Sequence, residues 1–352
     1  MIDKRCPPEW LALPPLQSAL GAAWRDLGRY EDARDAYLKA IQANDRTGRV
    51  PIKDIEQLAL VEGQLGERDH DEALVRRALE RLQQLDALVS SAETTPSAPT
   101  MAPPNAERCA LRGGAWKRLA SVHARQVLAP GIAAAAQRKA GDAMRQALVE
   151  AVKAYSLAEG VPGQSRFEPW LALNRLALDA LTPWASNAER DAALALDQQC
   201  AKAASESFRR DAGFYNAIMQ PEALLVELRL DGSLGRAGDA GTALLEKVAG
   251  AFREALSNIT FKPKELDSVL SQMCLLSRFH DALAVVDGAD APARAAEHRR
   301  MADRLIALAE LLQPGSCRRD DRPGEAAPAP APAAPRAKPR AKAKPRRSKP
   351  GK

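Results

Sequence analysis

Aromatic residues are scarce in this 352-residue chain, at 4% of the sequence, and β-branched residues seldom occur in runs separated by turns. Because strands are typically built from these residue types, their scarcity disfavours β-sheets. Alanine is abundant instead, and it is the best helix former as well as small enough to let helices pack closely. The composition therefore predicts an all-α protein, long enough to bury a sizeable core.

Cysteine is also rare, and no two of the five cysteines form a Cys-x-x-Cys pair: Cys6, Cys109, Cys200, Cys274 and Cys317. The first residues show no apolar segment behind their charges, as a secretion signal would. No uninterrupted apolar run approaches the roughly 20 residues that cross a bilayer. We therefore expect a protein of the reducing cytoplasm with no membrane partner.

The residue patterns of known catalytic and metal sites are missing. The four histidines have no H-E-x-x-H spacing, and neither a G-x-x-x-x-G-K-[ST] loop nor a G-x-G-x-x-G turn occurs. Cys109 follows no known nucleophile signature, so we interpret it as a buried structural thiol. The sequence predicts that the chain is not an enzyme and needs no cofactor or metal.

Two segments lack the bulky apolar residues of a packed core. Residues 90–106 are rich in Ser, Thr and Pro, and residues 314–352 consist mainly of Ala, Pro, Lys and Arg. Both are expected to be disordered. Arg336 to Lys352 carry nine basic and no acidic residues, which leaves 42 Lys+Arg against 45 Asp+Glu elsewhere. This tail is either a nonspecific contact for nucleic acid or another polyanion, or only a soluble extension.

The remaining sequence shows helical periodicity. Residues 20–45, LGAAWRDLGRYEDARDAYLKAIQAND, predict a helical hairpin with its turn at Gly28. The pattern resembles a tetratricopeptide repeat, in which small residues stand where two helices touch and aromatic residues fill the gaps beside them. The residues that carry this pattern are Gly21, Trp24, Gly28, Tyr30, Ala33, Tyr37 and Ala40.

The pattern recurs twice. A second hairpin over residues 55–85 has Ala59 in the place of Gly21, 38 residues later. A third copy follows 37 residues on when the loop over residues 90–106 is left out, and it contains an alanine-rich insertion around residues 131–142. Three hairpins suffice for a stable stack. The residues of the third copy are Gly113, Trp116, Ala151, Tyr155 and Ala158.

These patterns predict a tetratricopeptide-like α-solenoid with divergent C-terminal helices and a disordered basic tail. The expected organisation is an extension (1–14), two hairpins (15–89), the loop (90–106), divergent helices that complete one solenoid (107–313) and the tail (314–352). Six later helices are expected, at 169–181, 187–209, 221–230, 240–257, 264–278 and 293–312. The last pairs should cap the stack.

Several phrases outside the repeat pattern are found in the same order in a known family: IEQLALVEGQLG, ERCALRGGAWKRLA, AYSLAEG, FEPWLALNRLAL, DAGFYNAIMQPEALLVELRL and KPKELDSVLSQMCLL. Together they resemble the tetratricopeptide-repeat sensor modules found beside caspase-like and CHAT proteases in bacterial conflict systems. A related region precedes the kinase domain of apoptosis-signal-regulating kinases. The resemblance covers about residues 16–276. It implies a sensor that regulates a separate effector protein and takes a nucleotide-derived ligand. The chain departs from the family pattern at Gly114, where serine is usual, and at Tyr215, where tryptophan is common.

A candidate ligand site lies in the third repeat. Lys117 and Arg118 stand where the first copy has Arg25 and Asp26, a pair that can neutralise itself. Two adjacent cations suit a phosphate or a carboxylate, and Gly114 lets a ligand approach the backbone. Neighbouring first helices could add polar groups, so the candidate set is Lys117, Arg118, Gly114, Glu107, Gln57 and Asn174. The alternative is that Lys117 and Arg118 pair with Glu107 or with a carboxylate of another helix.

A second candidate cluster lies at the start of a later helix, after Pro263, where free N–H groups could receive an anion. Its members are Lys264, Glu265, Ser268 and Gln272. The alternative is a helix start at which Glu265 offsets the helix dipole.

Two functions remain open at this point. The first is a sensor scaffold that binds a small anionic ligand in its concave groove and controls a protease-like effector. The second is a protein interaction solenoid that grips a partner peptide or helix without any small molecule.

Overall fold

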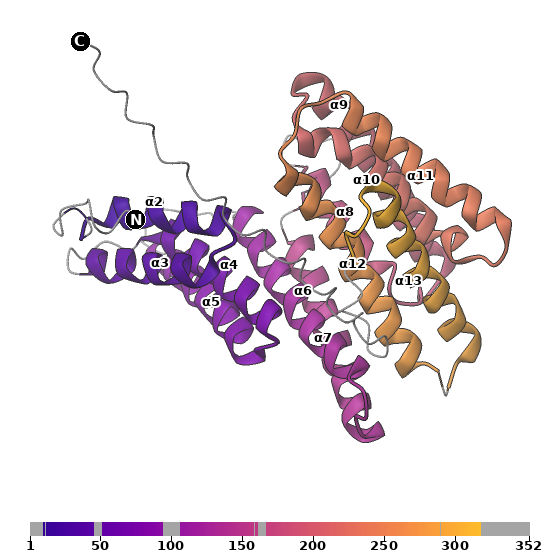
Figure 1. Ribbon diagram of the computed structural model, residues 1–352, viewed down its shortest axis with the longest axis horizontal. Helices are drawn as coiled ribbons and strands as arrows, with labels where there is room; N and C mark the ends of the chain where they lie inside the picture. Colours follow the sequence, from indigo (N-terminus) through magenta and orange to yellow (C-terminus); the bar gives the residue numbers. More distant parts are fainter. Residues whose placement is uncertain are drawn as a thin grey trace, which may run out of the picture.

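Figure 1 shows the chain as a computed structural model built from helices. The structure describes residue 10 and residues 12–45, 51–93, 106–157, 159–160, 167–288 and 290–317. These residues contain no strand, so the predicted all-α class is confirmed. The helices are α2 (Pro14–Asp26), α3 (Tyr30–Asp45), α4 (Ile52–Asp69), α5 (Glu72–Glu93), α6 (Ala106–Leu128), α7 (Ala134–Ser156), α8 (Pro169–Asp179), α9 (Asn187–Arg210), α10 (Phe214–Leu230), η2 (Ser233–Gly235), α11 (Asp239–Ser257), α12 (Pro263–Val286) and α13 (Pro292–Leu312).

Helices α2 to α7 form three consecutive hairpins, α2 with α3, α4 with α5, and α6 with α7 (Figure 1). In the first hairpin, the buried ring of Tyr37 lies against Gly21, where an added Cβ would come within 2.8 Å of the ring. In the third hairpin, Tyr155 makes the same contact with Gly113, at 2.7 Å. The two similar sequence segments therefore build the same helix packing at two places.

The small residues of the repeat pattern lie where the helices touch. Ala33, Ala40 and Ala151 are fully buried, and Trp24 and Trp116 pack half-buried against the hydrophobic clusters. Gly28 ends the first helix of its hairpin with a φ of 72°, a conformation that favours glycine. Tyr30 starts α3 and packs half-buried on the same cluster. Ala158 lies outside the described residues.

The helices of the third hairpin are longer than those of the first, and the alanine-rich insertion expected around residues 131–142 lies within this longer hairpin. Helix α7 starts at Ala134 and continues without a break to Ser156, so most of this stretch forms its first turns. Gly141 is buried against Val286 of α12, where an added Cβ would come within 2.7 Å. The small residues thus allow α12 to approach α7 closely.

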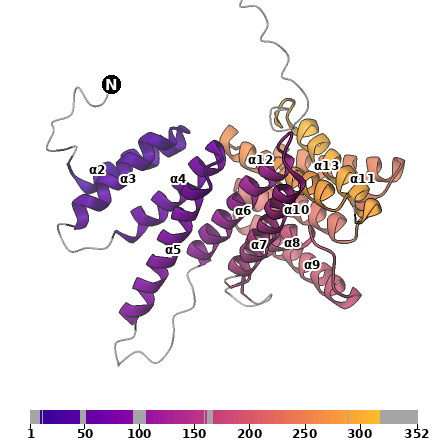
Figure 2. The same cartoon turned by 90° about the horizontal axis from the view of Figure 1, so that it is seen from below.

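Most of the hydrophobic core lies in the C-terminal part of the chain. One large cluster extends from Val75 of α5 to α13, whereas two smaller clusters involve α2 to α5 and the start of α6. In Figures 1 and 2, α2 to α5 lie at one end of the molecule, α8 to α13 at the other, and α6 and α7 between them. The hairpin of α6 and α7 therefore connects the two parts.

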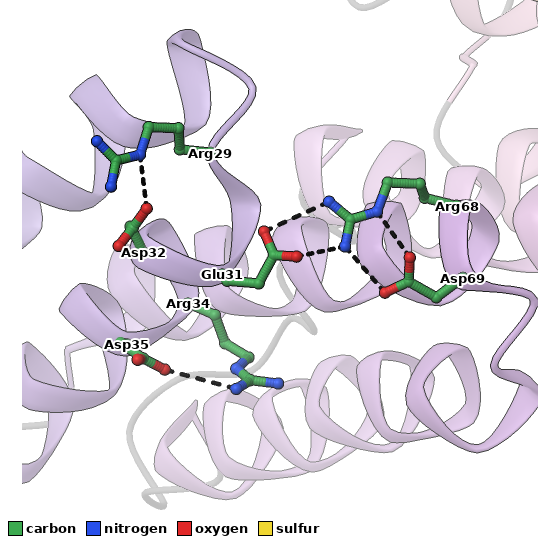
Figure 3. A network of polar contacts seen from close by, with 7 residues as sticks. All are labelled: Arg29, Glu31, Asp32, Arg34, Asp35, Arg68 and Asp69. Carbon is green, nitrogen blue, oxygen red and sulfur yellow. Dashed lines mark hydrogen bonds and ion pairs between the residues drawn. The ribbon is translucent and has the colours of Figure 1, made fainter.

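Exposed ion pairs add contacts between the first two hairpins (Figure 3). The guanidinium of Arg68 at the end of α4 binds Glu31 of α3 and Asp69 beside it. Arg29 and Asp32 form a further pair within the first hairpin, 2.6 Å apart. Such exposed pairs contribute little to stability, so the apolar seams must supply most of the free energy that holds the hairpins together.

Helix α12 does not simply cap the end of the stack, as the sequence led us to expect, but returns to the third hairpin. It packs along α6 and also touches α7. Arg278 of α12 donates to Ser121 Oγ of α6 at 2.9 Å, and Lys264 pairs with Asp26 of α2 at 2.6 Å. By length and composition α12 could cross a membrane, but 67% of its most apolar window is buried inside the fold. Its apolar character is therefore explained by its place in the core.

Several helices begin or end at residues other than those predicted. Helix α10 begins at Phe214 rather than at Pro221, which lies inside it. Helix α12 continues eight residues past Arg278. Helix α5 runs to Glu93, into the segment expected to be a loop. Residues 314–317, expected to open the tail, form a turn after α13.

Three other expectations fall largely outside the described residues. These are the extension before residue 10, the loop over residues 94–105 and the basic tail over residues 318–352.

Candidate ligand pocket

Lys117 of α6 points toward two helices that are distant in the sequence. Helix α6 buries Ala115 and Leu119 in the core, whereas the side chain of Lys117 projects from another face of the helix. Its Nζ donates hydrogen bonds to Asn174 Oδ1 of α8 at 3.1 Å and to Gln272 Oε1 of α12 at 2.9 Å. Lys117 therefore joins three helices through two uncharged acceptors.

The environment of Lys117 weakens its hold on a proton. Loss of water around the side chain lowers its pKa from 10.5 to about 8, helped by the nearby charge of Arg118 and opposed by Glu67 and Glu222. The ammonium is thus only partly compensated by the neutral amide oxygens that it contacts. An added negative charge nearby would stabilise the protonated form.

A pocket opens beside this lysine, between α8, α10 and α12. Its empty volume is about 450 Å³, including space open to solvent, and most of its wall is apolar. Four polar side chains line it: Asn174, Glu222, Arg229 and Gln272. An apolar pocket with a few converging polar groups is the usual form of a small-molecule site.

Arg229 is the least expected member of this pocket. The residue is only 4% exposed, and burial lowers its pKa from 12.5 to about 10, so it stays charged at neutral pH. Its Nε and Nη1 have no hydrogen-bond partner among the described residues. Nη2 lies 3.4 Å from Nε2 of His280, and an imidazole provides no negative charge to balance the guanidinium. A buried cation in this state is costly unless an anion compensates it.

Glu222 precedes Arg229 by seven residues and lies on the same side of α10. Its pKa rises from 4.5 to about 7 because it is buried, although the charge of Lys117 opposes this rise. The carboxyl is therefore partly protonated near neutral pH and offsets the two cations incompletely. The pocket as a whole keeps a surplus of positive charge, which suits an anionic ligand.

The structure separates the members of the first candidate set. Lys117 and Asn174 meet at the pocket, but Arg118 turns to α4, where its Nε lies 3.6 Å from Glu67 Oε2. The Arg118 guanidinium folds back over Gly114, whose missing Cβ leaves room for it. Arg118 therefore lies beside a carboxylate of another helix, which was our alternative to a ligand-binding role.

Glu107 and Gln57 also lie away from the pocket. Glu107 pairs with Lys53 of α4 at the surface. Gln57 accepts a hydrogen bond from Arg25, which also pairs with Asp26 at 3.1 Å. Asp26 therefore pairs with its neighbour Arg25, as the sequence comparison of the two copies suggested, and also with Lys264 of α12.

The second candidate cluster divides in the same way. Glu265 Oε2 accepts from the backbone N–H of Lys262 at 2.7 Å, so it caps α12. Ser268 bonds to its own helix at Glu265 O, and Lys264 reaches α2. Gln272 reaches the pocket and meets Lys117. Gln272 of the second cluster therefore meets Lys117 of the first, although the sequence reasoning kept the two clusters apart.

Glu222 and Arg229 were not identified as candidate site residues from the sequence. Both lie in DAGFYNAIMQPEALLVELRL, and Pro221 was taken as the start of a helix rather than as part of one. A signal was present in the sequence, because Glu222 and Arg229 lie seven residues apart among apolar residues and so share one helix face. A charged pair on the same face as core leucines indicates a buried polar site.

Comparison with known proteins finds a family that part of the chain resembles. Residues 29–179 match the profile of the family Tetratricopeptide Repeats-Sensor. No curated protein and no solved structure matches the chain. The matched region runs from the start of α3 through α8 and includes Lys117 and Asn174, whereas Glu222, Arg229 and Gln272 follow it. Residues 29–179 are therefore similar to a tetratricopeptide-repeat sensor module, which indicates a role as a sensor or repeat scaffold.

Proposed function

We propose that the chain is a non-enzymatic sensor scaffold that binds a small anionic, nucleotide-derived ligand in the pocket between α8, α10 and α12. The observation that carries this proposal is the buried guanidinium of Arg229, which has two N–H-bearing nitrogens without a partner. A guanidinium binds phosphate or carboxylate oxygens through such pairs of donors. Lys117, which donates hydrogen bonds to the lining residues Asn174 and Gln272, supplies a second cation.

The walls of the pocket support a ligand larger than a simple ion. Leucine, valine and methionine side chains from three helices surround the polar groups. Such walls favour a ligand with an apolar or ring portion beside its anionic group, because they gain by excluding water. A nucleotide-derived molecule has both parts.

The position of the pocket supports a proposed role in regulating a separate effector. A ligand that bonds to Arg229 and Lys117 contacts α6, α10 and α12 at once and favours the arrangement in which these helices are close. The ligand shifts the balance between two states only by its difference in affinity for them. We propose that an effector protein, such as a caspase-like or CHAT protease, recognises one of these states.

Thermal unfolding of the full chain with ADP, pyrophosphate or inorganic phosphate tests the ligand site. ADP should raise the melting temperature of the natural protein, and the rise should disappear in Arg229→Met and shrink in Lys117→Met. Arg118→Met is the matched control, because Arg118 contacts Glu67 rather than the pocket, and it should keep the ADP response. Equal responses of the natural protein and Arg229→Met would contradict the site.

The effector is tested separately. A pull-down with the full chain, repeated with and without ADP, should recover one stoichiometric protein whose binding depends on the ligand. Recovery of one protein that binds equally with and without ADP would favour a plain interaction solenoid.

A further inference from the structure

A disulfide joins the middle of α12 to the segment that follows α13. It links Cys274 and Cys317, which are 43 residues apart in the sequence, with a Cα–Cα distance of 5.8 Å. This distance lies within the range usual for disulfides. Widely separated cysteines gave no sign of this pair in the sequence, which led us to expect reduced thiols.

The turn that carries Cys317 is held by contacts other than the disulfide. The carboxylate of Glu310 in α13 accepts hydrogen bonds from the backbone N–H of Gly315 at 2.7 Å and from that of Cys317 at 3.4 Å. Gly315 has a φ of 79°, which glycine adopts without strain. We expect these contacts to keep Cys317 near Cys274 when both are thiols, which would leave little chain entropy to oppose bond formation.

The pair also differs from the other described cysteines in its access to solvent. Cys109 and Cys200 are free and buried, and burial raises the pKa of both thiols, that of Cys200 to about 12. Cys274 and Cys317 are half-buried. A thiol reacts as its thiolate and only where a reagent reaches it. Among the described cysteines, this pair is therefore the one placed to exchange with a soluble disulfide.

One end of the disulfide belongs to the stretch of α12 that lines the pocket. Cys274 follows Gln272 and Met273 in α12, and both of these line the pocket. Gln272 also accepts the hydrogen bond from Lys117. Fixing Cys274 to the end of α13 therefore restrains the stretch of α12 that shapes the ligand pocket.

We propose that Cys274 and Cys317 form a reversible thiol–disulfide pair, oxidised by low-molecular-weight disulfides such as glutathione disulfide, which restrains α12 against α13. The second half of the proposal rests on the proposed function: the oxidised form binds the anionic ligand more tightly, because Gln272 and its neighbours are already held in place. The chain would then respond both to a ligand and to the thiol–disulfide balance around it.

The exchange balances through a mixed disulfide. The thiolate of one cysteine attacks a sulfur of glutathione disulfide and releases one glutathione as its thiolate, which takes up a proton. The second cysteine then attacks the mixed disulfide, closes the Cys274–Cys317 bond and releases the second glutathione. The two cysteine thiols lose two electrons and two protons, and glutathione disulfide gains them.

Glutathione titration of the full chain tests the pair without any ligand. The protein is equilibrated over a range of reduced to oxidised glutathione, quenched with acid, alkylated and mapped by peptide mass spectrometry. The expected result is one internal disulfide between Cys274 and Cys317, while Cys109 and Cys200 are alkylated only after denaturation. Full alkylation of Cys274 and Cys317 in the oxidising buffer, or pairing with another cysteine, would overturn the proposal.

Glu310→Ala distinguishes a built pair from an incidental one. This change removes the acceptor of the turn but leaves both cysteines, and alanine keeps the helix. The equilibrium constant for disulfide formation with glutathione should fall on the order of tenfold, because the reduced turn no longer holds Cys317 near its partner. An unchanged constant would contradict a prearranged pair. Glu246→Ala, an exposed change on α11, serves as the matched control.

The coupling to the pocket is read from ADP affinity in the oxidised and the reduced protein. Tighter ADP binding in the oxidised protein, lost in Cys274→Ser, supports the coupling. Equal affinity in both forms would refute it while leaving the redox pair intact. No ADP binding in either form, with the disulfide formed as expected, would refute the proposed ligand and not the pair.

Discussion

Replacing Arg229 by methionine should stabilise the free protein while removing its response to ligand. Burial lowers the pKa of this guanidinium from 12.5 to about 10, and each pKa unit corresponds to about 1.4 kcal/mol. The charge therefore costs the folded state about 3 kcal/mol at neutral pH. Because the folded-state pKa is the lower one, this cost is present below about pH 10 and disappears as the pH rises toward the unfolded value.

Methionine is similar in length and apolar, so it fits the largely apolar wall without a charge. The free energy of unfolding should rise by up to about 3 kcal/mol, which corresponds to an increase of roughly 4 °C in the melting temperature of a protein of this size. Urea unfolding at pH 7.5 without ligand, followed by circular dichroism, measures the change. The same variant should show no further stabilisation when ADP is added.

Arg175 provides a control of opposite sign. This residue of α8 is also largely buried, but its guanidinium bonds to Glu159 and Asp179 at 2.7 to 2.9 Å. Arg175→Met should therefore destabilise the protein, because it leaves two carboxylates without their partner. If Arg229→Met destabilises the free protein as Arg175→Met does, Arg229 has a compensating partner and the argument for an anion site fails.

Three further predictions concern packing and pH. Gly113→Ala should lower the free energy of unfolding by about 1–2 kcal/mol in urea, because its Cβ would come within 2.7 Å of the Tyr155 ring; an unchanged midpoint would contradict this. Calorimetric ADP affinity should fall by up to about tenfold between pH 7 and pH 9 as Lys117, with a pKa of about 8, loses its proton; a flat profile would exclude its charge from binding. Burial lowers the pKa of both His280 and His298, so below about pH 6.5 the unfolded chain binds more protons at these two residues, and they lower the stability. The raised pKa of Glu222 acts in the opposite direction over the same range, so the natural protein is compared with a double leucine variant. The variant should gain stability relative to the natural protein between pH 7.5 and pH 5.5, and a constant difference would refute this.

The repeat could be predicted because it depends on contacts between adjacent helices of one hairpin. The spacing of Gly21 and Tyr37 within one hairpin, and of Gly113 and Tyr155 within another, determines which side chains meet when two adjacent helices pair. Short connections leave such helices few alternatives. The all-α class and the hairpins therefore followed from composition and spacing.

The return of α12 to α6 was not predictable in this way. The contact between Arg278 and Ser121 joins residues 157 positions apart, and no periodicity in either helix indicates its partner. The same limit applied to the site. Lys117, Asn174 and Gln272 were each recognised as polar candidates, but their meeting depends on where α12 lies. Arg118 was proposed as a ligand residue because its contact with Glu67 of α4 could not be foreseen. That contact depends on how the second and third hairpins stack.

Helix α12 links the features that distinguish this chain from a plain repeat stack. Its Gln272 shares the hydrogen bonding of Lys117, and Cys274 bonds it to the segment after α13. Its far end is held by Asp287, which pairs with Arg145 of α7 at 2.5 Å and with Arg294 of α13 at 2.9 Å. A ligand that draws Arg229 and Lys117 together, or an oxidant that closes the disulfide, therefore acts on the same helix. Because α12 follows the region that matches the sensor family, any response to these two inputs depends on the C-terminal helices as much as on the repeats.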